Sequence, residues 1–245
     1  MSAAILGEVR RSQPIAASLE LWLRADAGLF FDSALTVPIA TNGSLVGGWR
    51  DNAGLVLDEA TNKPTLQTNV VSGLPVVRFD GSNDWLSVAD PAALDMIGDQ
   101  TFFAVARTGS ASQGNILSHY ETGGSPFKGW GLAFNQVAGK FSYWSSTKGA
   151  WSGGATTVND NTWRLYGLTR EGGTVTFYVN GSVDGIVTGH GNVIQSAALA
   201  VGAVADGASD RLNGDVAELL VYSRALVPSE IASVGAYLRG KYNLY

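Results

Sequence analysis

The end of the chain constrains the fold most strongly, because a strand with two apolar faces runs there directly into an amphipathic helix. Alternate side chains in residues 215–222 are apolar on both faces, which predicts a strand covered on both sides. Pro228 opens the next segment, and apolar residues recur at helical spacing as far as Leu238. Val227 stands where Ser, Thr or Asp usually caps a helix, a departure that costs about 1 kcal/mol. The segment predicts a helix packed on a sheet. Strict alternation would place Ala217, Leu219 and Val221 on one face, and Val216, Glu218, Leu220 and Tyr222 on the other.

The rest of the chain has the pattern of an all-β protein with many tight turns. Glycine accounts for 31 of the 245 residues, without the period of collagen, and aromatic residues are frequent. The hairpin signal is clearest at 174–185, where Asn180-Gly181 suits a type I′ turn that pairs Val179 with Ser182 and Tyr178 with Val183. Further strands are predicted at 19–24, on both sides of the turn at 80–84, and at 101–107, 115–119, 129–134, 140–144, 163–169 and 199–203.

Charge and composition exclude several classes of protein. The net charge is −5 and the 16 basic residues are scattered, which argues against nucleic-acid binding. The absence of cysteine removes disulfides and thiolate chemistry, and no apolar run is long enough to cross a membrane. The N-terminus lacks the apolar core of a secretory signal, so export by that route would require a leader absent from this sequence. No linker interrupts the pattern, which predicts an arm at 1–18 and a single domain at 19–245.

Five segments in this order resemble the laminin-G-like, concanavalin A-like lectin/glucanase jelly-roll modules of bacterial surface proteins and phage virion proteins. The resemblance extends from Leu19 to Tyr242. It implies an all-β fold, a two-sheet antiparallel jelly-roll sandwich with a short C-terminal helix. It implies less about function, because lectins, adhesins, glycosidases and structural modules share this scaffold. The segments are LWLRADAG (21–28), GWRDNAG (48–54), LPVVRFDGSNDWLSV (74–88), LTREGGTVTFYVNG (168–181) and GDVAELLVYSRALVPSE (214–230).

Catalytic chemistry is not expected. Glycoside hydrolysis needs two carboxylates across the scissile bond, and no strand here carries acids at alternating positions. Glu218 stands alone in its strand, where an ion pair with Arg24 or Arg78 is the expected role. His119 and His190 have no neighbour in sequence of the kind that a general base or a metal site needs.

A glycan site would combine aromatic faces with polar loop groups, and one region offers both. The candidate residues are Trp130, Tyr143, Trp144 and Trp151, which stand among Gly and Ser. We expect at least one of Trp130, Trp144 and Trp151 to be exposed beside a groove. The alternative is core packing, because neighbouring residues of a strand point to opposite faces and one of Tyr143 and Trp144 must then point inward.

The resemblance also suggests calcium, although no cofactor is required. Two loops supply oxygen ligands, with Asp80, Asn83 and Asp84 in the first, and Asp206, Asp210 and Asn213 before the last strand, followed by Asp215. The alternative is structural, because tight turns need Asp, Asn and Gly for backbone reasons alone.

We therefore expect a non-catalytic attachment module that presents loops to a glycan or a protein surface. The favoured context is the virion surface of a phage, as a capsid-decorating or tail-fibre protein. The alternatives are a secreted bacterial carbohydrate-binding module and a glycoside hydrolase of the same fold. Expected partners are a glycan or cell-surface polysaccharide, and other virion proteins or a second copy through the arm at 1–18, whose few apolar residues would order only against a neighbour. Nucleic acid and membranes are not expected partners.

Overall fold

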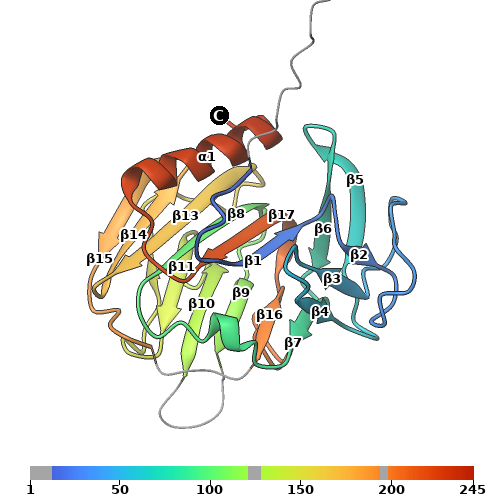
Figure 1. Cartoon of the computed structure of the whole chain (residues 1–245), viewed down its shortest axis with the longest axis horizontal. Helices are drawn as coiled ribbons and strands as arrows, with labels where there is room; N and C mark the ends of the chain where they lie inside the picture. The colour runs from blue at the N-terminus through green and yellow to red at the C-terminus, as the bar shows by residue number, and fades with distance from the viewer. Residues whose placement is uncertain (1–12, 121–127, 194–197) are drawn as a thin grey trace, which may run out of the picture.

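The protein is a sandwich of two antiparallel sheets with one helix on its outer surface (Figure 1). The computed structural model describes residues 13–120, 128–193 and 198–245. Helix α1 (Pro228–Tyr242) lies across the outer face of one sheet. Between β7 and β8 the chain forms a single short 3₁₀ helix, η1 (Ala92–Leu94), within the described ranges. The all-β jelly-roll sandwich with a C-terminal helix that the sequence predicts is confirmed.

The first sheet has eight strands among the described residues, in the order β15-β14-β13-β8-β17-β6-β5, with β1 beside β17. The last strand of the chain is central: β17 pairs with β8 along one edge, and with β6 and then β1 along the other. The terminal strands are thus neighbours, with Leu23 opposite Leu219. The bounds are β1 (Leu19–Arg24), β5 (Thr65–Val71), β6 (Leu74–Asp80), β8 (Gln100–Arg107), β13 (Arg164–Glu171), β14 (Thr174–Val179), β15 (Ser182–Val187) and β17 (Asn213–Tyr222).

The second sheet has nine strands in the described part of the chain, in the order β12-β11-β10-β9-β16-β7-β4-β3-β2. Its bounds are β2 (Leu29–Phe30), β3 (Gly48–Arg50), β4 (Val56–Asp58), β7 (Leu86–Val88), β9 (Gly114–Tyr120), β10 (Gly129–Phe134), β11 (Phe141–Ser145), β12 (Ser152–Gly153) and β16 (Leu199–Val201). The turn at 80–84 therefore carries the chain from β6 in one sheet to β7 in the other.

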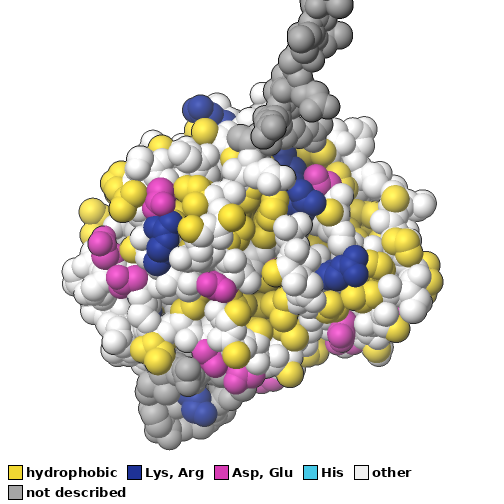
Figure 2. All heavy atoms as spheres, in the orientation of Figure 1, with side chains coloured by type: hydrophobic (Ala, Val, Ile, Leu, Met, Phe, Trp, Pro, Cys, Tyr) yellow, Lys and Arg dark blue, Asp and Glu magenta, His cyan; other side chains and the backbone are white. Residues whose placement is uncertain are grey.

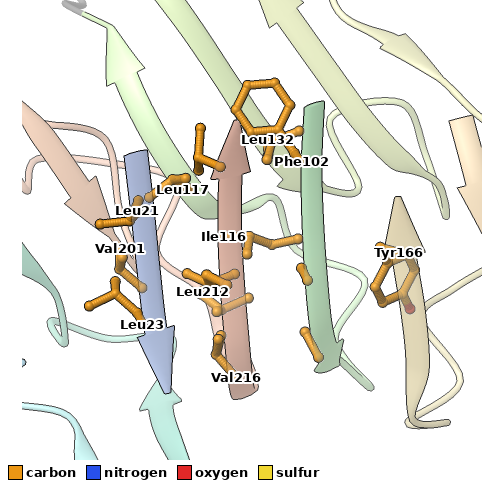
Figure 3. Close-up of a cluster of buried hydrophobic side chains, with 14 of the residues drawn as sticks. Leu21, Leu23, Phe102, Ile116, Leu117, Leu132, Tyr166, Val201, Leu212 and Val216 are labelled. Carbon is orange, nitrogen blue, oxygen red and sulfur yellow. The ribbon is translucent and has the colours of Figure 1, made fainter. Parts of the chain in front are cut away.

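The main core fills the space between the two sheets. Figure 3 shows Leu21 and Leu23 of β1 beside Val216 of β17, with Ile116 and Leu117 of the opposite sheet meeting them. A second cluster fills the space between the first sheet and α1, and includes Trp22, Leu220 and Leu238. Strand β17 contributes to both clusters, which confirms that it is covered on both faces.

The predicted alternation along β17 is wrong in its first half. The pairing with β8 shifts register between Val216 and Glu218, as a β-bulge does. Val216 consequently joins Leu219 and Val221 in the main core, while Ala217 faces the helix side with Leu220. The bulge leaves Glu218 on the helix side as well, where its partners lie.

The register of the hairpin formed by β14 and β15 was predicted correctly. Asn180 and Gly181 have φ of 51° and 79°, and Val179 pairs with Ser182 and Tyr178 with Val183. Both positive φ angles are those a type I′ turn requires. The strand predicted at 19–24 matches β1, and that at 129–134 matches β10. Strands β2 to β5 and β12 were not predicted as strands.

Val227 supplies no capping side chain at the N-terminus of α1, and Glu230 in the first turn of the helix takes that role. Glu230 accepts a hydrogen bond from the Val227 N–H at 3.1 Å, and Arg224 donates to both oxygens of that carboxylate at 2.6 and 2.7 Å. The side-chain hydrogen bonds from Arg224 lower the pKa of Glu230 to about 2. The charged acid thus occupies the positive end of the helix.

The described end of the N-terminal arm packs on its own domain. Pro14 is buried, and Ile15 contacts the cluster between the first sheet and α1. The expectation that the arm orders only against a neighbour is wrong for these residues, because two apolar side chains find a surface within the chain. Residues 1–12 of the arm lie outside the described residues.

Candidate functional site

The four aromatic residues predicted as a sugar platform do not form one. Trp130 and Tyr143 have no exposed surface, because both point into the main core, where Phe102 packs against each of them. Their side chains therefore have no face to offer a sugar. Trp144 is 7% exposed and Trp151 is half-buried. The alternative of core packing describes this region better.

Trp144 and Trp151 meet on the outer face of the second sheet, around Tyr120. The Tyr120 ring lies 5.2 Å from the ring of Trp144 and 6.1 Å from that of Trp151. Val204 completes this small cluster. Neighbouring residues Tyr143 and Trp144 thus point to opposite faces of β11, as the period of a strand requires. Neither of two surface cavities in the described part of the chain, one lined by Arg50 and the other by Arg107, borders these rings.

The two acidic loops predicted for calcium do meet in space. Asn213 is opposite Asp80 in the pairing of β17 with β6, and the Arg211 guanidinium donates to the Ser82 carbonyl at 2.8 Å. Their side chains, however, are used within the loops. Asp80 accepts from the N–H groups of Ser82 and Asn83, Asp84 from that of Asp80, Asp206 from that of Ala208, and Asp210 from the Gln136 amide.

The contacts of Asp80 with Ser82 and of Asp206 with Ala208 are those of Asx turns, and they favour the structural alternative for both loops. In the described part of the chain, no three His, Cys, Asp or Glu ligand atoms of these loops come within metal-binding distance of one another. Asp215 lies between two guanidinium groups, at 2.6 Å from Arg78 and 2.7 Å from Arg107. Burial raises the pKa of the Asp84 carboxyl to about 6. Calcium binding at these loops stays a prediction.

Glu218 has a partner that the sequence did not indicate. Its carboxylate is fully buried and pairs with Lys241 of α1 at 2.7 Å, whereas Arg24 lies 3.7 Å from Asp26 and Arg78 pairs with Asp215. The predicted ion pairs with Arg24 and Arg78 are wrong, because α1 brings Lys241 to the Glu218 carboxylate and each arginine pairs with an aspartate instead. Three neutral groups also donate to the Glu218 carboxylate: the Trp22 indole at 2.6 Å and the hydroxyls of Tyr237 and Tyr242, each at 2.8 Å. Glu218 thereby ties β1, β17 and α1 together.

The two histidines are both buried, and burial lowers the pKa of each to about 4. His190 has a serine hydroxyl on each ring nitrogen, Ser145 at 2.8 Å and Ser152 at 3.0 Å. A histidine with two satisfied nitrogens and no exposed surface has a structural role. His119 differs, because its Nε2 is buried without a hydrogen-bond partner.

A surface cavity of about 450 Å³ lies beside the Glu218 cluster, between the segment that follows β1 and the segment that follows β3. It is lined by Trp22, Arg24, Ala27, Gly28, Arg50, Asp51, Asn52, Ala53 and Gly54. All nine belong to the first two resemblance segments, 21–28 and 48–54. Those segments identified the fold, but sequence reasoning assigned them no site, because nothing in the sequence shows that they face each other.

Two hydrogen bonds to backbone carbonyls hold the two walls of this cavity together. The Arg50 N–H donates to the Gly28 carbonyl at 2.8 Å, and the Trp49 indole donates to the Arg24 carbonyl at 3.0 Å. Gly28 has φ of +76°, and a Cβ there would lie 2.1 Å from the Arg50 carbonyl oxygen. Only glycine allows the two backbones to come this close. The close approach of Gly28 to Arg50 therefore fixes how the two walls of the cavity lie against each other.

The charged groups of the cavity are unequally neutralised. The Arg24 guanidinium stacks 4.7 Å from the Trp22 ring and lies near Asp26, which also binds Lys241 at 3.1 Å. Asp51 is 6% exposed and accepts hydrogen bonds from the N–H groups of Ala53 and Leu55. Arg50 is exposed over the Phe30 ring and makes no ion pair within the described residues. The cavity thus offers a cation to a ligand.

Figure 2 shows acidic and basic side chains interspersed among apolar and neutral ones over most of the face that it draws. Over residues 13–120, 128–193 and 198–245, no helix combines the length and the apolar character of a membrane span.

Two facing antiparallel sheets, closed by the pairing of the first and last strands and bearing a cavity at one side, define a lectin-like β-sandwich module. The family model for the concanavalin A-like lectin/glucanases superfamily, Laminin_G_3, matches residues 80–232. The chain belongs to this superfamily. The resemblance stated from the sequence is confirmed. No curated protein sequence matches the chain significantly.

Solved structures of similar fold come from larger proteins. The binding domain of Paraclostridial Mosquitocidal Protein 1 matches with a TM-score of 0.64 and 12% identity, over 90% of this chain and 52% of that one. Trypanosoma rangeli sialidase with difluorosialic acid matches at 0.60 and 16%, over 93% and 33%. The ligand-binding domain of botulinum neurotoxin serotype D, in complex with N-acetylneuraminic acid, matches at 0.54 and 13%, over 89% and 50%. The chain spans half of each toxin domain and a third of the sialidase. At these identities the likeness shows the fold alone.

Proposed function

We propose that this protein is a non-catalytic glycan-binding module whose site is the cavity beside Trp22, and that the ligand is a sugar with a carboxylate. One observation carries the proposal: the exposed guanidinium of Arg50, without a carboxylate partner in the described part of the chain, lines a cavity that also holds Arg24. A planar guanidinium binds a carboxylate through two parallel hydrogen bonds.

The other lining groups suit a sugar. Carbohydrates present hydroxyls that need donors and acceptors, together with apolar ring faces. Asn52 is exposed and supplies an amide, the segment 52–54 supplies backbone groups, and Trp22, which is 8% exposed, supplies a small apolar surface. A volume of about 450 Å³ falls within the usual range of small-molecule sites.

Two of the similar structures support the ligand class by their own ligands. The serotype D domain is described in complex with N-acetylneuraminic acid, and the Trypanosoma enzyme with a derivative of sialic acid. Both are acidic sugars. They support the proposal as examples of this scaffold with such a ligand.

The lack of a second acid supports a binding role rather than hydrolysis. Asp51 is the only carboxylate among the described residues that line the cavity, and two backbone N–H groups already occupy one of its oxygens. A glycosidase of the usual kind needs a pair of carboxyl groups about 5 to 9.5 Å apart, and a sialidase uses a tyrosine nucleophile, which is not among the residues that line this cavity. The cavity presents one carboxyl group.

The test is calorimetric titration of the protein with sialyllactose, and with lactose as the neutral match. We expect binding of sialyllactose that Arg50→Gln weakens about tenfold or more, since a charge-assisted contact is lost. Arg239→Gln is the matched control, because that arginine is also exposed and also lies over an aromatic ring, that of Tyr245. Equal affinity for both sugars would contradict the acidic ligand, and release of sialic acid would contradict the non-catalytic role.

The virion surface is the context that we propose for this module, with residues 1–12 as its attachment segment. Its support is the sequence pattern, which resembles modules of phage virion proteins and contains no cysteine. Deletion of residues 1–12 should then leave the fold and the cavity intact while it removes assembly with the virion partner. Assembly that survives the deletion, measured by co-sedimentation with virions, would contradict this role.

A further inference from the structure

Three side chains outside the cavity gather at one end of the sandwich. Asp90 follows β7, Asp95 follows η1, and His119 lies near the end of β9. One ligand atom from each lies within 4.8 Å of the other two. Elsewhere in the described chain no such group of three forms.

His119 is the member that indicates a ligand. Its side chain is 1% exposed, and its Nε2 has no hydrogen-bond partner. Buried ring nitrogens are normally satisfied, as both are in His190. The Asp90 carboxylate is 3.6 Å from Nε2, too far for a hydrogen bond. That separation fits two ligands of one ion, which stand about 3.4 Å apart when each is 2.1 Å from a tetrahedral metal.

Asp95 adds a second unsatisfied atom. Its Oδ1 is buried and has no hydrogen-bond partner. An oxygen of its carboxylate lies within 4.8 Å of an Asp90 carboxylate oxygen and of a His119 ring nitrogen. Two carboxylates that face each other beside an unpartnered imidazole are stabilised by a cation between them.

We propose that Asp90, Asp95 and His119 bind a divalent transition-metal ion of the zinc type. An imidazole with two carboxylates is a set that Zn²⁺, Co²⁺ and Mn²⁺ accept, whereas Ca²⁺ and Mg²⁺ prefer oxygen ligands alone. Three protein ligands leave a further position for water. The Asp90 side chain is half exposed, which leaves it free to close on the ion.

The ion would connect two parts of the sandwich. Asp90 and Asp95 belong to the connection from β7 to β8, which passes from the second sheet to the first, and His119 belongs to the second sheet. The ring of His119 is held in place by that of Trp130, 5.4 Å away. A metal here ties the connection to β9, so the folded state gains stability with metal concentration.

The test uses the full chain, stripped with a chelator and titrated with Zn²⁺ and Co²⁺. We expect one equivalent to bind, with a rise in the melting temperature and, for Co²⁺, a visible spectrum of nitrogen and oxygen ligation. Asp90→Asn should weaken binding about tenfold or more, and His119→Gln should remove the nitrogen signature. Asp90 is half exposed, so the first variant remains informative if the second does not fold.

Asp99→Asn is the matched control, because Asp99 is an exposed acid of the same connection whose Oδ1 accepts from the Gly172 N–H. Its binding should equal that of the wild type. Three results would overturn the proposal: no bound Zn²⁺ or Co²⁺, binding unchanged in both ligand variants, or a preference for Ca²⁺ over Zn²⁺.

Discussion

Replacement of Glu218 by glutamine tests the central contact of the fold. The buried carboxylate accepts hydrogen bonds from the Trp22 indole, the two tyrosine hydroxyls of α1 and the Lys241 ammonium, at 2.6 to 2.8 Å. Glutamine has nearly the same shape. It replaces one accepting oxygen by an amide that donates, so that donors face a donor, and it removes the charge that balances Lys241.

The expected loss follows from those contacts. Each hydrogen bond to a charged group contributes about 1.5 to 3 kcal/mol, and removal of one partner of a buried ion pair costs about 3 to 5 kcal/mol. The glutamine oxygen keeps some of the four contacts, and Lys241 keeps Asp26 at 3.1 Å. We therefore expect Glu218→Gln to lower the free energy of unfolding by about 3 kcal/mol, a large part of the 5 to 15 kcal/mol typical of a domain.

Urea denaturation followed by tryptophan fluorescence measures the change. Glu20→Gln is the matched control, since Glu20 lies on β1 and, among the described residues, its carboxylate accepts from the Ser223 hydroxyl alone, at the surface. Its effect should stay within about 0.5 kcal/mol. Lys241→Met removes the other partner of the pair and should also be strongly destabilising. A loss below about 1 kcal/mol in both Glu218→Gln and Lys241→Met would refute the role of this cluster.

Three further changes have defined outcomes. Burial raises the pKa of Asp84 in the folded state to about 6, above the ordinary value of 3.8, so the proton binds the folded state more tightly than the unfolded state. The stability that this proton contributes is present below pH 4 and is lost as the pH rises to 6. Relative to Asp84→Asn, the wild type should therefore lose on the order of 1 to 3 kcal/mol over that interval in urea titrations, and a constant difference would contradict the argument. Gly28→Ala should destabilise the fold by about 2 kcal/mol or more and abolish sugar binding, because its Cβ meets the Arg50 carbonyl; normal binding would contradict the close approach. Gly181→Ala should cost about 1 kcal/mol in the type I′ turn, and an unchanged melting temperature would show that the turn tolerates it.

Local patterns predicted the elements of the fold well. The strand at 19–24 and the register of the Asn180-Gly181 hairpin follow from side-chain period and turn chemistry, which depend on neighbours in sequence. The bulge between Val216 and Glu218 does not follow from local sequence, because an extra residue in a strand can be recognised only when its partner strand is known. The ion pair of Glu218 was missed for another reason, because sequence does not show which helix residue, here Lys241, lies over the strand.

The sites were predictable to a smaller extent. Whether Trp130 or Trp151 is exposed depends on which side of the second sheet its ring lies. The Gly- and Ser-rich composition around these tryptophans does not show which side that is. The cavity depends on segments 21–28 and 48–54, which are brought together by β2 and β3, strands of two and three residues that give almost no periodic signal. From the sequence alone, Arg50 cannot be told from an ordinary surface cation, because the sequence does not show that it lines a cavity.

The central position of β17 also determines when the protein can fold. Leu19 pairs with Tyr222, so the sheet is completed by residues separated by nearly the whole chain, and contacts of this kind make folding slow. During synthesis the edges of β8 and β6 that pair with β17 remain unpaired until β17 has left the ribosome. Such edges are open to pairing with other chains. The protein is therefore most at risk of aggregation while β17 has not yet been made, and truncation ahead of β17 should yield insoluble product.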